Sequence, residues 1–456
     1  MDKTLSESSS ETSRGISQGN TDTAEALRGA LALAGPEVAG ILERALRGDE
    51  ITVAQGARLF DATGAEVLPL LLTADTLRAQ AVGDVVRYVV NRNINFTNVC
   101  VKRCGFCAFS RGHTAGEGYF LPMEEVIRRA AEAHELGATE VCVQAGLAPG
   151  LDGWWYVDMV RQLHQALPDL HIHACSPEEV IYGSELAGVP VAEYLTALKE
   201  AGLGSLPGTS AEILVDEVRD AISPGRLTTA QWVELLRTAH GLGIPTTSTI
   251  MYGHVETGRH KAQHLAVLRE LQKETGGITE LVPLGFIHEE APMFHKRPPA
   301  GLRSGPGGLE GLKMHAVSRI MLHGHIHNIQ VSWVKDGPRL AQVGLMAGAN
   351  DMGGTLINES ISTAAGARHG QFMPPAALRT LIREAGRIPV ERATTYATLR
   401  EFRGPGADPA QDPTHPLDGI EPGDPRFGSY AELAGNGAFR FKDFHQQAKT
   451  AQEAVR

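Results

Sequence analysis

Residues 95–107 read Asn-Phe-Thr-Asn-Val-Cys-Val-Lys-Arg-Cys-Gly-Phe-Cys, and this stretch carries three of the five cysteines of the chain. Cys100, Cys104 and Cys107 have the spacing C-x3-C-x2-C, so three thiols fall within eight residues. Thiolates are the usual ligands of iron–sulfur clusters, and a short irregular loop lets three of them converge on one cubane. The spacing therefore predicts a [4Fe-4S] cluster with one iron that no side chain ligates.

Zinc and disulfide bonds are the other common uses of clustered cysteines. A structural zinc site needs four ligands, usually as two separated pairs, whereas Cys142 and Cys175 are isolated in the sequence. Disulfide bonds fit poorly because the cysteine count is odd and we expect no secretory signal. The cluster is the preferred interpretation.

The sequence beyond residue 83 alternates short aliphatic or β-branched runs with amphipathic stretches, in the order of βα units. This pattern predicts an α/β fold, a (β/α)8 barrel of TIM type that is closed or partly open. The cysteine loop follows the first predicted strand, at the face where such barrels carry their active sites. The predicted strands are 85–90 leading into 93–98, then 140–144, 170–174, 204–206, 246–251, 278–283, 329–333 and 345–349.

Composition divides the chain into four regions. Residues 1–22 are rich in Ser, Thr and Gly, which predicts a disordered leader. The apolar spacing over 23–82 predicts an N-terminal helical cap, with one helix starting after Thr52. The barrel is expected over 83–372, followed over 373–456 by one helix and an irregular C-terminal extension.

The charge pattern argues against two classes of binding partner. The formal net charge is −11, and Lys and Arg are scattered, which argues against nucleic acid and against a polybasic membrane surface. We find no apolar run near the roughly 20 residues that a membrane span needs. We therefore expect a cytoplasmic protein that acts on small molecules, a compartment that also keeps cysteines reduced.

The cysteine motif, with Phe106 before its third cysteine, resembles that of the radical S-adenosylmethionine enzymes. In that family the amino and carboxylate groups of S-adenosylmethionine bind the open iron, so the resemblance implies this cofactor and radical chemistry. It implies further cofactor contacts at Phe106 near the adenine, Gln144 and Gly146 near the methionine amine, Glu212 at the ribose hydroxyls or the amine, and Tyr252 at the adenine edge. Phe106 as a loop plug, Gly146 as a plain turn and Glu212 as a helix N-terminal acid are the alternatives.

Polar residues after other predicted strands are candidates for substrate binding. Asn350 and Asp351 end the predicted eighth strand, and two glycines follow closely. Ser176 and Glu178 follow the third strand, and His288 lies after the sixth. A capped turn at 350–351 and a helix cap at Ser176 are the alternatives. The sequence singles out no catalytic acid or base.

A closer resemblance rests on residues 93–100, 107–111, 208–214 and 348–355, among them Asn-Ile-Asn-Phe-Thr-Asn-Val-Cys and Cys-Ala-Phe-Ser-Arg. Over about residues 50–400 they look like the second subunit of FO synthase. The resemblance implies transfer of the 4-hydroxybenzyl group of L-tyrosine to 5-amino-6-(D-ribitylamino)uracil in deazaflavin coenzyme biosynthesis. Aminofutalosine synthase and futalosine cyclase of menaquinone biosynthesis share much of this pattern and are the alternatives.

The resemblance also implies protein partners. An electron donor protein would have to reduce the cluster, and the first subunit of FO synthase is a candidate partner. A hypothesis of another class is an iron–sulfur electron carrier or scaffold without chemistry of its own. Such a carrier needs no deep barrel cavity and should not cleave S-adenosylmethionine.

Overall fold

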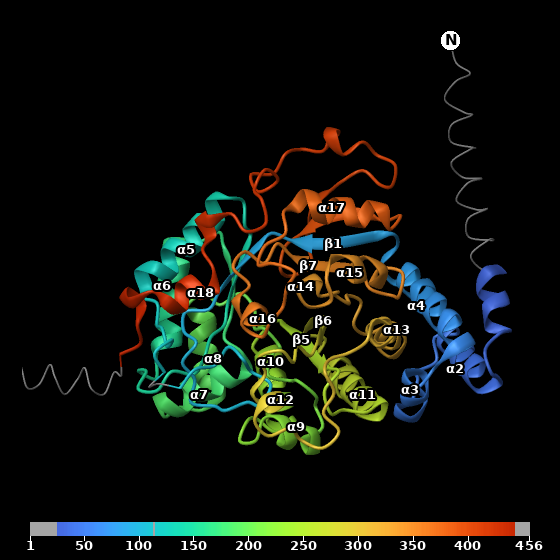
Figure 1. Cartoon of the computed structure of the whole chain (residues 1–456), viewed down its shortest axis with the longest axis horizontal. Coiled ribbons are helices and arrows are strands. Elements are labelled where there is room, and N and C mark those ends of the chain that lie inside the picture. The colour runs from blue at the N-terminus through green and yellow to red at the C-terminus, as the bar shows by residue number, and fades with distance from the viewer. Residues whose placement is uncertain (1–24, 113–114, 443–456) are drawn as a thin grey trace, which may run out of the picture.

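Parallel strands form the centre of the molecule (Figure 1), whose computed structural model describes residues 25–112 and 115–442. Within those residues the strands form three sheets. One sheet has the order β7 (Asp351–Gly354), β1 (Val85–Val89), β8 (Ile388–Arg392) and β9 (Thr398–Glu401). The second consists of β2 (Asn91–Ile94), β3 (Glu140–Val143) and β4 (His171–Ala174), and the third of β5 (Thr246–Tyr252) and β6 (Ile278–Gly285). Every ladder is parallel except the β8–β9 hairpin.

Isolated bridges join the three sheets into a ring. β1 runs almost directly into β2, and the segments 204–206 and 329–330 fill the fourth and seventh positions. Because these two positions pair through single bridges, the barrel is partly open there. The α/β fold class and the weak, glycine-containing fourth strand are therefore confirmed. The bridges pair Arg92 with Ile357, His173 with Ser205, Leu206 with Thr246, Leu281 with Ile329, and Gln330 with Asp351.

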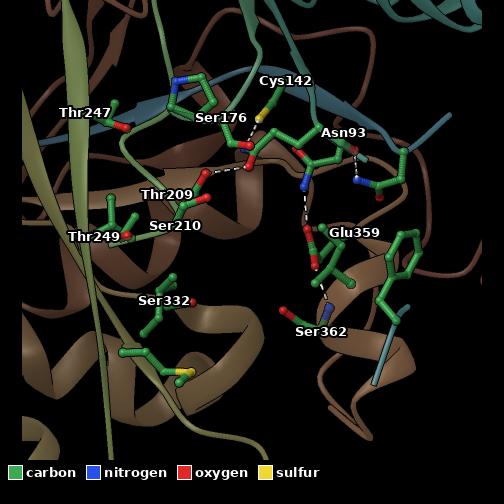
Figure 2. Close-up of a pocket in the computed structure, with 18 of the residues that line it drawn as sticks. Asn93, Cys142, Ser176, Thr209, Ser210, Thr247, Thr249, Ser332, Glu359 and Ser362 are labelled. Carbon is green, nitrogen blue, oxygen red and sulfur yellow. Dashed lines mark hydrogen bonds between the residues drawn. The ribbon is translucent and has the colours of Figure 1, made fainter. Parts of the chain in front are cut away.

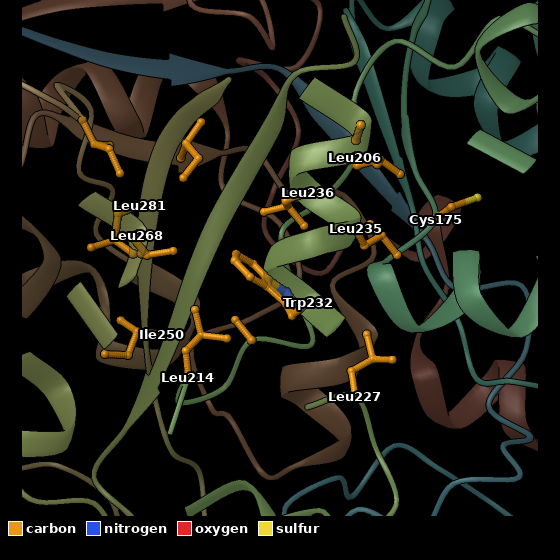
Figure 3. Packing of buried hydrophobic residues seen from close by; sticks show 14 of the residues in the cluster. Cys175, Leu206, Leu214, Leu227, Trp232, Leu235, Leu236, Ile250, Leu268 and Leu281 are labelled. Atoms are coloured by element: carbon orange, nitrogen blue, oxygen red, sulfur yellow. The ribbon is translucent and has the colours of Figure 1, made fainter. Parts of the chain in front are cut away.

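Helices surround this ring (Figure 1). Several begin at a threonine or serine whose side chain caps the helix, as at Thr228 before α10 and Ser176 before α7. In Figure 3, Trp232, Leu235 and Leu236 of α10 lie among the buried apolar side chains of the barrel core. The bounds are α5 (Met123–Glu135), α6 (Trp155–Ala166), α7 (Pro177–Ala187), α8 (Val191–Glu200), α9 (Asp216–Ile222), α10 (Thr229–Gly241), α11 (Gly258–Thr275), α12 (Pro292–His295), α13 (Gly308–Leu322), α14 (Trp333–Asp336), α15 (Pro338–Gly344), α16 (Ser360–Ala364) and α17 (Pro375–Glu384).

The N-terminal helices lie against the outside of the barrel. They are α2 (Pro36–Leu46), α3 (Val53–Phe60) and α4 (Val67–Val82), with a short 3-10 turn η1 (Gly64–Glu66) before α4. Thr52 caps α3, as the sequence predicts. Helix α3 packs against α11, and α4 packs against α13. The leader expected over 1–22 lies outside the described residues.

One predicted strand is wrong and another is shorter than predicted. The run 345–349 forms turns between α15 and β7, where Gly348 has a φ of +94°. Leu345, Ala347 and Ala349 are buried without strand pairing, so their burial produced the strand-like pattern, whereas Met346 is exposed. Asn350 and Asp351 consequently stand at the start of β7 and not at its end. The seventh strand, expected to reach Trp333, stops earlier because Trp333 begins α14.

The C-terminal region returns to the barrel. No element was predicted over 388–401, yet β8 extends the sheet beside β1. Further along are the short elements η2 (Pro409–Gln411), η3 (Pro425–Phe427), α18 (Tyr430–Gly435) and η4 (Gly437–Phe439). The tail then pairs with the segment that follows the cysteine loop, since the Phe120 amide donates to the Phe439 carbonyl at 2.8 Å and the Phe441 amide to the Gly118 carbonyl at 2.9 Å.

A buried ion-pair network ties β8 to the barrel interior. Arg392 Nε donates to Asp351 Oδ2 at 2.6 Å, and Arg392 Nη2 lies 3.4 Å from Glu280 Oε2. The guanidinium also stacks on the Tyr396 ring, 4.1 Å from its centroid. Asp351 is completely buried.

In the described chain no helix is both long and apolar enough to cross a bilayer.

Replacing Asp351 with alanine should lower the free energy of unfolding by about 3–5 kcal/mol, because Arg392 would stay buried after losing its closest partner. Urea denaturation of the cluster-free protein measures the loss. Asp351→Asn is the matched control, because its amide oxygen still accepts hydrogen bonds, and it should cost less. An alanine variant as stable as the parent would contradict this role.

Candidate functional site

A cavity of about 410 Å³ occupies the barrel interior and opens beside the cysteine loop. Residues from seven of the eight strand positions line it, and at the fourth position the lining comes from the segment just after the strand, with Pro207, Thr209 and Ser210. Figure 2 shows Asn93 of β2, Cys142 of β3 and Thr249 of β5 among the lining residues. Cys100, Cys104 and Cys107 line the same cavity and are free thiols. The three predicted cluster ligands therefore share one chamber.

Backbone hydrogen bonds fix the cysteine loop. The Cys100 amide donates to the Arg111 carbonyl at 3.1 Å, and the Val101 amide donates to the Leu147 carbonyl at 2.9 Å. The Gly105 amide donates to the Ile222 carbonyl at 2.8 Å. These bonds attach the loop to three other segments, which fixes where its thiols point.

Burial affects the acidity of these thiols. It raises the pKa of Cys104 to about 12, although the nearby Arg226 guanidinium acts to lower it. Burial also raises the pKa of Cys100. Since metal ligands bind as thiolates, loading of the loop would release protons. The donor set of three free thiols fits an iron–sulfur cluster.

The remaining cysteines differ from the triplet. Cys142 lies on β3, where its sulfur accepts a hydrogen bond from Gln144 Nε2 at 3.2 Å, and it lines the cavity from a strand. Cys175 is 1% exposed and does not line the cavity. Burial raises the pKa of both thiols above the ordinary value.

Gly146 lies directly against the cysteine loop. A Cβ atom at this position would stand 2.3 Å from the Val99 carbonyl oxygen and 3.1 Å from the Cβ of Cys100. The neighbouring Gln144 accepts a hydrogen bond from the Thr209 hydroxyl at 2.9 Å. The predicted glycine is thus required by packing, and its segment forms one wall of the cavity.

Arg226 joins two predicted site residues to the cluster loop. Its Nε donates to Glu178 at 3.0 Å, and its Nη1 donates to Glu212 at 3.1 Å and lies 3.5 Å from Cys104 Sγ. Burial opposes ionisation of Glu178, but Arg226 and Lys102 hold its pKa below the ordinary value. Arg226 was not predicted, because its only signal in the sequence is its place in a Pro-Gly-Arg turn.

Glu212 has an unusual conformation. Its φ is +39°, and one carboxylate oxygen is buried without a hydrogen-bond partner. Arg219 lies 3.8 Å from that oxygen. Functional sites often contain residues with such a strained, positive-φ backbone. Here that residue also has a carboxylate oxygen without a hydrogen-bond partner next to the cysteines.

The other predicted residues divide into two groups. Phe106 and Ser176 line the cavity, and Ser176 also caps α7. Tyr252, His288, Asn350 and Asp351 are absent from the described lining. Asn350 instead accepts a hydrogen bond from Arg319 at 2.7 Å, and His288 packs against Phe294 with a centroid distance of 4.6 Å.

Three polar side chains that line the cavity from the barrel strands, those of Glu140, His173 and Glu280, were not predicted as site residues. Burial raises the pKa of Glu280 to about 7 and lowers that of His173 to about 4. Glu140 accepts a hydrogen bond from Asn91 at 2.9 Å. Their only signal is a polar residue inside an apolar strand, which could have indicated a hydrated barrel interior.

The chain matches two family models. Residues 94–268 match the model described as Radical SAM superfamily, and residues 277–403 match the CofH/MqnC C-terminal region. A protein of Methanothermobacter thermautotrophicus called 5-amino-6-(D-ribitylamino)uracil–L-tyrosine 4-hydroxyphenyl transferase is 47% identical over 79% of this chain and 97% of its own. A protein of Methanocaldococcus jannaschii with the same name is 47% identical over 77% of this chain and 98% of its own.

Solved structures are similar in fold. The FeFe-hydrogenase maturase HydG from Carboxydothermus hydrogenoformans has a TM-score of 0.61 at 16% identity, covering 84% of this chain and 86% of that one. Methylornithine synthase (PylB) has a TM-score of 0.54 at 19% identity, covering 69% of this chain and 86% of that one. These likenesses support the barrel assignment.

Replacing Gly146 with alanine should shift the cysteine loop, because the new methyl group would overlap the Val99 carbonyl. We expect a stability loss of about 1–3 kcal/mol and a reduced iron content after anaerobic reconstitution. Gly241→Ala is the matched control, since a Cβ there meets nothing within 4 Å. Normal iron content and stability in the Gly146 variant would refute the packing argument.

Proposed function

The chain belongs to the family of 5-amino-6-(D-ribitylamino)uracil–L-tyrosine 4-hydroxyphenyl transferases within the radical S-adenosylmethionine superfamily, and we propose that it catalyses this transfer. In the proposed reaction the 4-hydroxybenzyl group of L-tyrosine moves to C5 of 5-amino-6-(D-ribitylamino)uracil. The observation that carries the proposal is identity of 47% over 97% of a named relative. A cysteine-lined barrel cavity in the same chain supports it.

The cofactor residues follow from the cavity. Cys100, Cys104 and Cys107 would hold a [4Fe-4S] cluster, leaving one iron for S-adenosylmethionine. When bound, this pair supplies a radical that takes a hydrogen atom from tyrosine. Phe106, Gln144, Gly146 and Glu212 line the cavity beside the loop and are the proposed contacts of S-adenosylmethionine.

Tyr252 has a more indirect place in the proposal. Its side chain is buried away from the cavity, but the preceding Met251 lines it. A contribution to the adenine site would therefore come through the backbone at the end of β5. Among the proposed substrate residues, Ser176 and Glu178 have direct access, whereas Asn350, Asp351 and His288 would act through neighbours.

The chain itself provides enclosure and position. Loss of a hydrogen atom from tyrosine would be followed by cleavage of its Cα–Cβ bond, leaving 2-iminoacetate and a 4-hydroxybenzyl radical that adds to the uracil. The adduct radical would then lose one proton and return one electron to a one-electron acceptor, which balances the electron that the reductant supplied at the start. Both substrates must meet before that radical escapes. A chamber walled by the barrel strands holds reactants together and excludes water, which favours addition over side reactions.

Partners and compartment are part of the proposal. Reduction of the cluster requires an electron donor protein, and the first subunit of FO synthase is the candidate protein partner. Five free cysteines suit a reducing compartment, so we place the protein in the cytoplasm.

The cysteine assignment has a direct test. Alanine at Cys100, Cys104 or Cys107 should each abolish the iron–sulfur absorption and most bound iron after anaerobic reconstitution, because a cubane held at two corners is labile. Cys142→Ala is the matched control and should retain iron, since Cys142 lies on a strand. Iron loss from the Cys142 variant with retention in the Cys104 variant would reverse the assignment.

Substrate choice has a separate test. With reductant and S-adenosylmethionine, the reconstituted enzyme should form the hydroxybenzyl–uracil adduct, detected by mass spectrometry. Omission of tyrosine or of the diaminouracil should abolish it. Formation of aminofutalosine from the corresponding enolpyruvyl substrate, without a tyrosine adduct, would assign the chain to menaquinone chemistry, and failure to cleave S-adenosylmethionine would favour an electron carrier.

A further inference from the structure

The basic side chains around the cavity are balanced within the protein except at one, and three of its carboxylates, those of Glu140, Glu179 and Glu359, have no ion-pair partner in the described chain. The basic residues that line the cavity are Lys102, His173, Arg226, Lys335 and Arg392. Lys102 pairs with Glu178 at 3.0 Å, Arg226 with Glu178 and Glu212, and Arg392 with Asp351. His173 hydrogen-bonds to Ser205 at 2.7 Å. The side chain of Lys335 has no ion-pair or hydrogen-bond partner among the residues that the structure describes.

Lys335 lies on α14, directly after the seventh strand position. It is half-buried, and burial lowers the pKa of its ammonium. Holding an ammonium in a partly desolvated cavity without a counter-ion costs free energy. A ligand carboxylate would remove that cost, so the position favours an anionic ligand group.

Glu359 is the complementary case. It lies in front of α16 and accepts hydrogen bonds from the Ser362 amide at 2.7 Å and from Asn93 Nδ2 (Figure 2). Its carboxylate is buried and has no basic partner within ion-pair distance in the described chain. It lines the same cavity as Lys335 and favours the charged form of that lysine, although the two are farther apart than an ion pair.

An unpaired cation and an unpaired anion in one chamber match the two charges of a free α-amino acid. We propose that Lys335 binds the carboxylate and Glu359 the ammonium of L-tyrosine, an inference that rests on the proposed function. Leu284, Phe286 and Leu356 line the same cavity and would surround the aromatic ring. The diaminouracil carries no carboxylate, and the amino and carboxylate groups of S-adenosylmethionine are needed at the open iron.

Binding measurements with truncated ligands test this clamp. The reconstituted holoprotein with S-adenosylmethionine and without reductant is dialysed against tyrosine, tyramine or 3-(4-hydroxyphenyl)propionate. The parent enzyme should bind tyrosine about 10- to 100-fold more tightly than tyramine, which lacks the carboxylate. Lys335→Gln should erase that preference and leave tyramine affinity unchanged, whereas Lys335→Arg should keep much of it.

The second truncated ligand, 3-(4-hydroxyphenyl)propionate, tests the role of Glu359. Glu359→Gln should erase the preference for tyrosine over 3-(4-hydroxyphenyl)propionate, which lacks the amine. Lys273→Gln is the matched control, because Lys273 is exposed and pairs with Glu50 outside the cavity. It should bind all three ligands as the parent does.

The outcomes separate this inference from the proposed function. A parent enzyme that binds tyrosine but binds tyramine equally well overturns the clamp, whether or not the variants fold. Retention of the preference by Lys335→Gln, or loss of S-adenosylmethionine affinity in its place, also overturns it. A parent enzyme that binds no tyrosine overturns the proposed function itself.

Discussion

Pairing of buried charge is the constraint on which this barrel depends. Arg226 and Arg392 each bind two carboxylates from segments far apart in the sequence, and each guanidinium is buried enough that loss of its partners would be costly. Arg226 fixes the loop of Glu212 and the start of α7 beside the cysteines. Arg392 attaches the C-terminal hairpin to the barrel interior. Each arginine thus fixes cavity-lining segments relative to one another, Arg226 beside the cysteine loop and Arg392 at the strands β6, β7 and β8.

Much of the barrel could be predicted because its signals are local. Short apolar runs located most strands, and the helix expected after Thr52 begins where predicted. The run 345–349 was wrong because buried turns and buried strands have the same apolar composition. Strand β8 was missed because its partner β1 lies about 300 residues earlier, and periodicity does not report such pairing.

The site was predictable to the extent that its residues adjoin a recognisable motif. The cysteines, Gly146 and Glu212 gather at one cavity, as the position after barrel strands indicates. Arg226, Lys335 and Glu359 carry no motif, and their roles become visible only from the spatial arrangement, which pairs Arg226 with two carboxylates and leaves Lys335 and Glu359 without an ion-pair partner in the described chain. Asn350 and Asp351 were predicted as ligand contacts because polar residues beside glycines favour binding, but their partners in the structure are Arg319 and Arg392.

The contact between residues 430–441 and the segment after the cysteine loop affects when the loop can take its final structure during synthesis. Residues 439–441 pair with residues 118–120 after Cys107, and Tyr430 packs on Phe109 with ring centroids 5.5 Å apart. These residues leave the ribosome about 320 positions after the last cluster cysteine, a delay of roughly 20–60 s at ordinary translation rates. During that interval the loop lacks its outer support, so the thiols reach their final arrangement only after residue 441 has been synthesised. Delivery of a cluster to the supported loop would accordingly follow the synthesis of residues 430–441.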